Sequence, residues 1–184
     1  MDAQEFHRRV WEILKAVDDS LFEVVGGSAA SADDIAAVEA ATGLRVPEYL
    51  AGIVSAPSNT NGLAVIVREH VWPEPDEFSV GPAWTFWRGV YLLGIDVPDL
   101  PEYVRITTAH TKLAAAGFTD VLPLIKVRGC GNRFWGVNPS GAMVFVYDGE
   151  ETVLEGQNLA DVYAEQISDL LQRQRDMAQR LRSA

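Results

Sequence analysis

The sequence has almost no cysteine and no long apolar run. Cys130 is the single cysteine among 184 residues, so no disulfide can form within the chain and no cysteine cage for zinc can be built. The longest candidate for a membrane span, residues 85–95, is interrupted by Arg88 and is shorter than the roughly 18 residues that a span requires. The sequence therefore predicts neither a disulfide-stapled secreted scaffold nor a membrane protein.

A secretory leader is also missing from the pattern of the first residues. The chain begins Met-Asp-Ala-Gln-Glu, which is acidic and amphipathic, whereas a secretory signal needs a basic start and an apolar stretch. We therefore expect a cytoplasmic protein. Because 48% of the residues are apolar and 22% are charged, the composition suits one globular domain that buries about 70% of its unfolded surface.

Positive charge is scarce. The chain has 26 acidic and 15 basic side chains, which give a net charge of −11 at pH 7. Because nucleic-acid binding depends on Lys and Arg side chains that neutralise phosphates, we predict no nucleic-acid partner. Residues 1–100 carry sixteen acidic and six basic groups, and residues 101–184 carry ten and nine. The excess negative charge of residues 1–100 could steer a basic partner towards the protein, or its only role could be to keep the protein soluble.

Helical patterns dominate the start of the chain. Apolar residues at spacings of three and four predict an amphipathic helix over residues 3–19, with Gly26-Gly27-Ser28 ending that unit. Ser31 is a suitable N-cap for a second helix, and Gly43 is suited to end it. Pro47 fits the first position of a short third helix.

From Leu63 the pattern changes to short, partly β-branched runs that are typical of strands. Residues 69–84 contain three prolines and are interpreted as a loop. Pro123 favours an edge strand or a bulge. The remaining predicted elements are strands at 63–67, 89–95 and 121–127, a hairpin of 133–137 and 142–147 around Asn138-Pro139-Ser140-Gly141, and helices over 102–116 and from Asn158 onwards.

Residues suited to catalysis are few. His7, His70 and His110 have no His or Cys partner at the helical spacing of metal ligands, so we predict no metal site. Neither a dinucleotide fingerprint nor a phosphate loop is present, so we predict no cofactor. Cys130 could act as a nucleophile with His110 as its base, or it could be a small buried hydrophobe between two turn-forming glycines.

An acidic run beside a tryptophan is the main candidate for a binding surface. Aromatic anchors with a charged rim are typical of protein interfaces, and we predict that the partner-binding residues are Trp72, Glu74, Asp76 and Glu77. Two of the carboxylates could instead form a pair for acid–base catalysis, or the run could be a solvated loop. Core packing is the alternative for the tryptophans, which include Trp72, Trp84, Trp87 and Trp135.

The last residues of the chain are rich in arginine. Arg173, Arg175, Arg180 and Arg182 follow one another towards the end of the predicted last helix. Cations are favourable at that end of a helix dipole, although such a group could also contact RNA or anionic lipid.

The stretch from Ser31 to Leu50 resembles the opening of the SUKH superfamily, which includes a fungal cell-wall assembly regulator and many bacterial toxin-immunity proteins. In that pattern an acid-capped helix ends at Gly43 and is followed by Leu44, by the pair Val46-Pro47 and by a short helix. The later features that are similar in order are Leu122-Pro123-Leu124-Ile125, the turn Gly129-Cys130-Gly131-Asn132, the hairpin from Phe134 to Tyr147 and the closing helix.

The resemblance covers residues 30–172. Residues 1–29 then form an N-terminal helix and connector, and residues 173–184 form the arginine-rich end of the last helix. Two departures concern single residues: Asn132 stands where the family often has Asp, and the turn at 59–62 matches the family's Asn-Gly only loosely.

The resemblance implies an α+β fold in which a mixed, mostly antiparallel sheet packs against helices on one side. It also implies a protein that is not an enzyme, binds a basic toxin domain, often a nuclease, and neutralises it. Two alternatives remain open: a regulatory or adaptor domain unrelated to toxins, and a small enzyme that uses Cys130 or a carboxylate pair.

Overall fold

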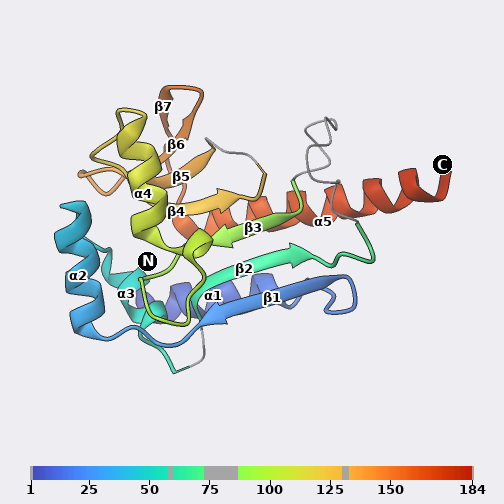
Figure 1. The fold of residues 1–184 in the computed structure, drawn as a ribbon, viewed down its shortest axis with the longest axis horizontal. Coiled ribbons are helices and arrows are strands. Elements are labelled where there is room, and N and C mark those ends of the chain that lie inside the picture. Colours follow the sequence, from blue (N-terminus) through green and yellow to red (C-terminus); the bar gives the residue numbers. More distant parts are fainter. Residues whose placement is uncertain (1, 58–59, 73–86, 130–132, 184) are drawn as a thin grey trace.

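The computed structural model describes residues 2–57, 60–72, 87–129 and 133–183. Within these residues the chain forms five α-helices, one 3-10 helix and seven strands (Figure 1). In chain order they are α1 (Ala3–Leu14), β1 (Phe22–Gly27), α2 (Ala32–Thr42), α3 (Glu48–Val54), β2 (Asn61–Val67), β3 (Gly89–Leu92), η2 (Glu102–Val104), α4 (Ile106–Ala115), β4 (Leu122–Val127), β5 (Phe134–Val137), β6 (Met143–Tyr147), β7 (Glu150–Val153) and α5 (Leu159–Ser183).

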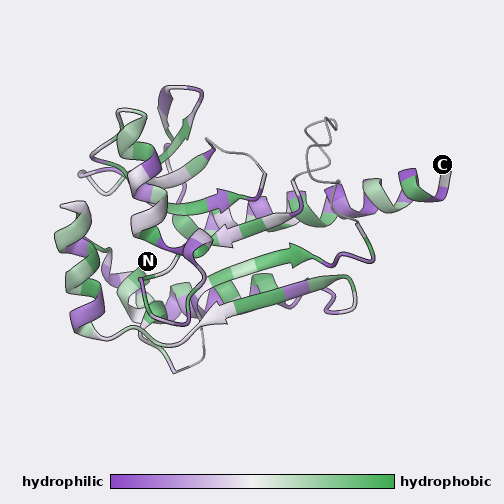
Figure 2. Cartoon of the chain, viewed as in Figure 1, coloured by the Kyte–Doolittle hydropathy of each residue, from purple (hydrophilic) through white to green (hydrophobic). Residues whose placement is uncertain are grey.

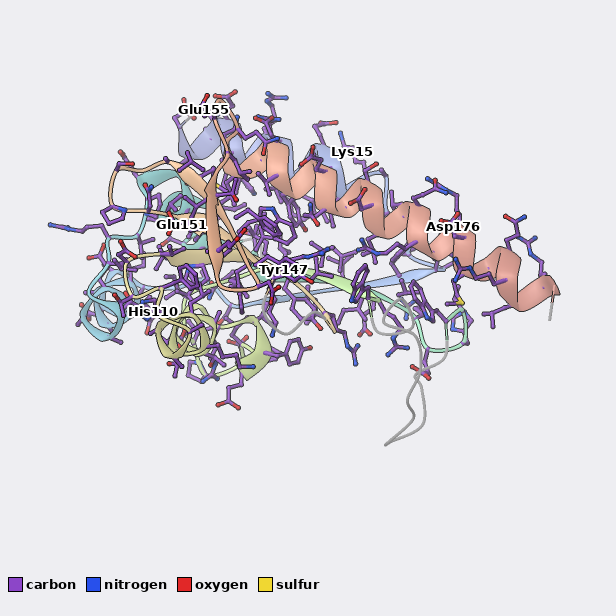
Figure 3. The ribbon with its side chains drawn as sticks, turned by 90° about the horizontal axis from the view of Figure 1, so that it is seen from above. Lys15, His110, Tyr147, Glu151, Glu155 and Asp176 are labelled. Carbon is purple, nitrogen blue, oxygen red and sulfur yellow. The ribbon has the colours of Figure 1, made fainter. Side chains whose placement is uncertain are left out.

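The seven strands form one sheet in the order of the chain, β1 to β7, and each pair of neighbours is antiparallel. A parallel bridge joins Gly94 to Arg105. The predicted α+β domain, with a mostly antiparallel sheet packed against helices, is confirmed. Helices cover both faces rather than one: α1 and α5 lie on one face, and α4 with η2 lies on the other (Figure 3).

The core lies on both sides of the sheet, because the central strands are buried along nearly their whole length. Figure 2 shows hydrophobic residues concentrated in these strands, while α5 alternates between hydrophobic and hydrophilic positions. The sequence pattern predicts five inward residues in α5: Leu159, Val162, Ile167 and Leu170 are buried, and Leu171 is half-buried against the core. The segment 1–29 contributes α1 and β1 to the same core and sheet.

The helix predicted over residues 3–19 is shorter in the structure. It ends at Leu14, and the Asp18 carboxylate accepts hydrogen bonds from the backbone and hydroxyl of Ser20, at 2.9 and 2.7 Å. Such an Asx turn competes with helical hydrogen bonding. The chain then reverses into β1, where Val24 and Val25 suit an extended backbone and pair with β2.

Two further differences arise where the chain turns. Strand β7 was not predicted; it follows a two-residue turn in which Asp148 and Gly149 both have positive φ angles, 51° and 83°, as hairpin turns require. The helix predicted over 102–116 divides into η2 and α4 at Arg105, whose backbone is extended. The Arg105 side chain donates hydrogen bonds to the carbonyls of Leu100 and Val97, which stabilises this break.

Several local predictions are confirmed. Ser31 and Asp34 form a reciprocal capping box at the start of α2, and Gly43 ends that helix with φ of 73°. Pro47 lies one residue earlier than predicted, at the N-cap of α3. A register shift in the pairing of β4 with β5 follows Pro123, as expected for a proline at a bulge.

Hydrogen bonds connect α1 to the start of α5. The Arg9 guanidinium donates hydrogen bonds of 2.6 Å to Asp161 and 3.2 Å to Asn158. The Asn158 side chain in turn accepts from the backbone N–H groups of Ala160 and Asp161, so it caps α5 as predicted. The hydrogen bond from Arg9 holds the pKa of Asp161 below its usual range.

This contact predicts a pH dependence of stability. Because the pKa of Asp161 is lower in the folded protein, its contribution is present above its unfolded pKa of about 3.9 and is lost as the pH falls through the folded pKa. An Asp161→Asn variant is expected to unfold at a lower temperature than the wild type at neutral pH, with the difference shrinking below about pH 4. Thermal unfolding across this range tests it, with Glu165→Gln on the same helix as the control. A temperature gap that stays constant as the pH falls would contradict this role.

Candidate partner-binding site

Of the four residues predicted to bind a partner, only Trp72 lies within the described residues; Glu74, Asp76 and Glu77 lie outside them. Trp72 is 3% exposed. Its carbonyl accepts a hydrogen bond of 2.6 Å from the buried guanidinium of Arg88, which also pairs with Glu69 at 3.1 Å. The indole is therefore part of the core and not an exposed anchor on a rim.

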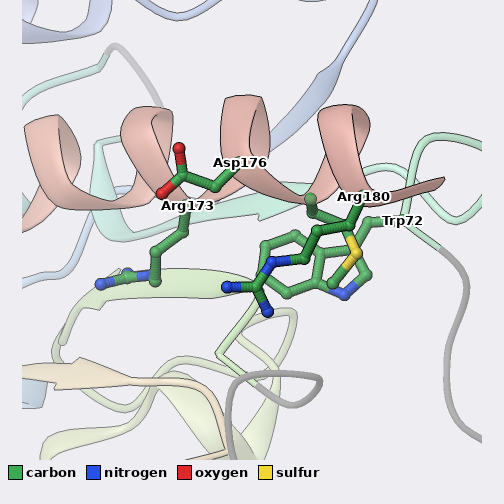
Figure 4. Close-up of a pocket in the computed structure, with 5 residues that line it drawn as sticks. Trp72, Arg173, Asp176 and Arg180 are labelled. Atoms are coloured by element: carbon green, nitrogen blue, oxygen red, sulfur yellow. The ribbon is translucent and has the colours of Figure 1, made fainter. Parts of the chain in front are cut away.

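Arginines outnumber carboxylates among the described side chains around Trp72. A pocket of about 60 Å³ beside it is lined by Trp72, Arg173, Asp176, Met177 and Arg180. Figure 4 shows the Arg173 and Arg180 side chains projecting from α5 in the same general direction, while the carboxylate of Asp176 points away from both guanidinium groups. The described side chains that surround the predicted anchor thus come mainly from the arginine-rich helix.

Among the described residues, carboxylates are concentrated at one end of the molecule, where Arg45 and Arg105 also lie, and arginines are concentrated at the other. At one end, formed by α2, α3, η2 and the adjoining loops (Figure 1), the exposed or half-buried acids are Asp33, Asp34, Glu39, Glu48, Asp99 and Glu102. We call these six residues the acidic end. At the other end, formed by the second half of α5 and the facing ends of β2 to β5, the arginines are Arg68, Arg88, Arg128, Arg133, Arg173, Arg175, Arg180 and Arg182. Asp18, Asp19, Glu69 and Asp176 also lie at this second end.

Hydrogen bonds keep two carboxylates of the acidic end charged. Asp34 accepts from the backbone and hydroxyl of Ser31, at 2.8 and 2.6 Å, and these bonds lower its pKa. Asp99 accepts from the hydroxyl and backbone of Ser28, at 2.7 and 3.0 Å, and its pKa is lowered for the same reason. Both side chains are therefore fixed, negatively charged groups at neutral pH.

The other carboxylates at this end are more open to a partner. Glu39 lies 3.9 Å from Arg45 and accepts a hydrogen bond from the backbone of Val46. Within the described ranges, no Lys or Arg lies within 4.0 Å of the exposed carboxylates of Asp33, Glu48 or Glu102. These three carboxylates are therefore available to pair with cations of another molecule.

Two of the histidines considered for catalysis or metal binding, His7 and His110, have hydrogen-bonding partners. His110 is 9% exposed and its Nε2 lies 3.1 Å from the carbonyl of Thr119, while Cys130 lies outside the described residues. His7 accepts a hydrogen bond of 2.7 Å from the indole of Trp11. In the part of the chain that the structure describes, no three His, Cys, Asp or Glu side chains come together as metal ligands would. No helix in that part combines the length and the apolar character needed to cross a bilayer.

The structure defines a class of protein: an α+β domain with a seven-stranded antiparallel sheet that is covered by helices, with more carboxylates at one end and more arginines at the other among the described residues. A comparison with known protein families and a search of curated proteins each find no match to this chain. The SUKH resemblance of residues 30–172 therefore stays a prediction carried by the motifs quoted above.

The acidic end was not predicted as a unit. Asp33 and Glu48 begin α2 and α3, while Asp99 and Glu102 come from the segment after β3. The antiparallel sheet, the hydrogen bonds between Ser28 and Asp99, and those of the Asn61 side chain to Ser28 and Ile95 bring these segments to one end of the molecule. The count of acids in residues 1–100 gave the sign of the charge but not its location.

Proposed function

We propose that this protein binds and neutralises a bacterial toxin, without catalysis, by covering a basic surface of the toxin with its acidic end. The separation of charge along the molecule is the observation that carries the proposal. A toxin that acts on nucleic acid needs a basic surface to hold phosphates, and carboxylates at fixed positions can take the place of those phosphates. The partner is thus a basic protein domain in the cytoplasm of a bacterium.

The acidic end is built on regular structure, which supports a binding role. Asp33 and Glu48 lie in the first turns of α2 and α3, where the helix dipole favours negative charge. The carboxylates of Asp34 and Asp99, which are held by hydrogen bonds, lose little conformational freedom when a partner binds. A negative surface of this kind also raises the rate at which a basic protein arrives, by about 10- to 1,000-fold at low salt.

The local structure of α2 and α3 supports the choice of the immunity class. The capping box at Ser31, the left-handed Gly43 and the position of Pro47 before α3 lie at the residues that carry the SUKH resemblance. In that family, toxin neutralisation is a common role. The expected partner is the product of a neighbouring gene, because an immunity protein is expected beside its toxin.

Charge reversal at defined positions tests the proposal. In the first variant, Asp33, Glu48 and Glu102 are each replaced by Lys. In the matched control, Glu150, Glu151 and Glu155 at the opposite edge of the sheet are each replaced by Lys, which changes the net charge by the same amount. The association rate with the purified product of the neighbouring gene is measured at several salt concentrations.

We expect the first variant to associate about 10- to 100-fold more slowly at low salt and to lose most of its salt dependence, while the control changes less than about threefold. A third variant, with Glu74, Asp76 and Glu77 replaced by Lys, tests the site predicted from the sequence. If the first variant slows association no more than the control, the acidic end is not the interface and the proposal is wrong; slower association of the third variant alone would place the interface at Glu74, Asp76 and Glu77 instead.

A further inference from the structure

A single charged side chain interrupts the buried strand β4. Every residue of Leu122–Val127 is buried except Lys126, which is half-buried. In the described ranges, no carboxylate oxygen lies within 4.0 Å of its Nζ atom, which lies 6.0 Å from the centre of the Phe134 ring. Burial lowers the pKa of Lys126, and the positive charge of Lys112 lowers it further. A bound anion would oppose both effects, because a charge of opposite sign stabilises an ammonium group.

Two tyrosines lie on the same face of the sheet as Lys126. Tyr91 is directly opposite Lys126 in the pairing of β3 with β4, so the two side chains share a face. The Tyr91 ring contacts that of Tyr103 in η2, with their centres 5.2 Å apart. Tyr91 is 4% exposed and Tyr103 is 45% exposed. The buried ring therefore supports an exposed one beside the lysine.

These side chains line a hollow of about 300 Å³ in the surface, which we call the Lys126 hollow. The residues that line it are Tyr91, Tyr103, Lys126, Arg128 and Gly129. Among the described residues, no carboxylate lines the hollow, although Glu102 is next to Tyr103 in the chain. The lining thus combines two positive side chains with two aromatic rings. Its volume is at the lower end of the range of about 300 to 1,000 Å³ that is typical of small-molecule sites.

We propose that the Lys126 hollow binds a small aromatic anion, whose charged group pairs with Lys126 and whose ring packs against Tyr103. A half-buried ammonium group and the nearby charge of Arg128 attract an oxyanion. A bare oxyanion fills only a small part of the hollow, because one water molecule occupies about 30 Å³ in the liquid. The remaining space is beside the exposed ring of Tyr103, and aromatic rings favour offset or edge-to-face contact with one another.

This site goes beyond the proposed toxin binding and does not depend on it. It takes a ligand of negative charge, whereas the acidic end takes a positive one. The charged group of the ligand can be a carboxylate or a phosphate, since an ammonium group binds either as a point charge. The test therefore includes an aromatic probe of each kind.

Amide NMR spectra of the full chain are recorded during titration with benzoate or phenyl phosphate, up to about 20 mM at about pH 7 and constant ionic strength. We expect saturable shifts at Tyr91, Tyr103, Lys126 and Gly129, with half-saturation below about 1 mM. Acetate and inorganic phosphate lack the ring, and benzyl alcohol lacks the charge; each is expected to bind at least about tenfold more weakly. Tighter binding of benzoate assigns a carboxylate to the ligand, and tighter binding of phenyl phosphate assigns a phosphate.

Variants of the two principal side chains locate the binding. Lys126→Gln and Tyr103→Leu are each expected to weaken binding of both probes at least about tenfold, whereas Tyr103→Phe keeps the ring and is expected to keep binding. The matched controls are Lys15→Gln on α1 and Tyr147→Leu, which remove an exposed lysine and a tyrosine that is 44% exposed. Both are expected to bind the probes as the wild type does. The same spectra show whether each variant is folded.

Three results would overturn the proposal. The first is that neither aromatic probe causes saturable shifts in the wild type. The second is that folded Lys126→Gln and Tyr103→Leu proteins bind both probes as tightly as the wild type. The third is that acetate and inorganic phosphate bind as tightly as benzoate and phenyl phosphate, because the ring would then contribute nothing.

Discussion

Replacing Asn61 by Asp is expected to destabilise the protein by about 3 kcal/mol, although the two side chains have nearly the same shape. Asn61 is fully buried. Its Nδ2 donates to the carbonyls of Ser28 and Ile95, at 3.1 and 2.9 Å, and its Oδ1 accepts from the backbone of Ile95 at 2.8 Å. An Asp keeps only the last of these bonds and places a second oxygen against two carbonyl oxygens.

The amide of Asn61 connects three segments: the residue after β1, the start of β2 and the loop after β3. Its loss therefore weakens the sheet at the acidic end. Urea unfolding at 25 °C measures the difference in free energy, and Gln157→Glu makes the same chemical change at an exposed position. The control is expected to change stability by less than about 0.5 kcal/mol. An Asn61→Asp variant as stable as the control would show that this network does not hold the segments together.

Replacing Gly136 by Ala is expected to cost about 3 kcal/mol, because β4 and β5 approach each other too closely for a side chain. A Cβ atom at Gly136 would lie 2.3 Å from the carbonyl oxygen of Leu122 and 2.9 Å from a methyl group of Val121. The first contact is with backbone, which cannot move aside as a flexible side chain could. The strands must separate, and the pairing next to Pro123 is lost.

Gly43→Ala is the matched control for this prediction. A Cβ atom there would have no neighbour within 4 Å, but the φ of 73° is unfavourable for alanine, at a cost of about 1 to 2 kcal/mol. The two variants thus separate a steric clash from a backbone preference. If urea unfolding gives Gly136→Ala the smaller loss of stability, β4 and β5 do not approach as closely as described.

The local signals in the sequence predicted much of the fold. Ser31, Gly43 and Asn158 were correctly identified because capping depends on neighbouring residues alone. Strand β1 was missed because Leu21 continues the apolar spacing of the preceding helix, which hid the turn at Asp18. Strand β7 has the sequence Glu-Glu-Thr-Val and is exposed, so no buried face marks it. The dipeptide Asp148-Gly149 could have revealed it, since it is typical of a two-residue hairpin turn.

The candidate sites were harder to predict, because they depend on long-range packing. Trp72 was expected on an acidic rim from its neighbours in the sequence, yet its indole lies beside arginines that follow about a hundred residues later. The guanidinium of Arg133, just before β5, lies over rings from two other segments, Trp87 before β3 and Tyr147 in β6. The spacing of these residues in the sequence does not predict that they are neighbours in space; that follows only from the order of the strands in the sheet.

We propose that this protein acts by covering the basic surface of another protein. The most direct measurement is the association rate of the wild-type protein with the purified product of its neighbouring gene, from about 25 to 300 mM salt. We predict a stable complex whose association slows at least tenfold over this range, together with loss of the partner's toxic activity. Failure to form a complex, or association that is independent of salt, would contradict the account.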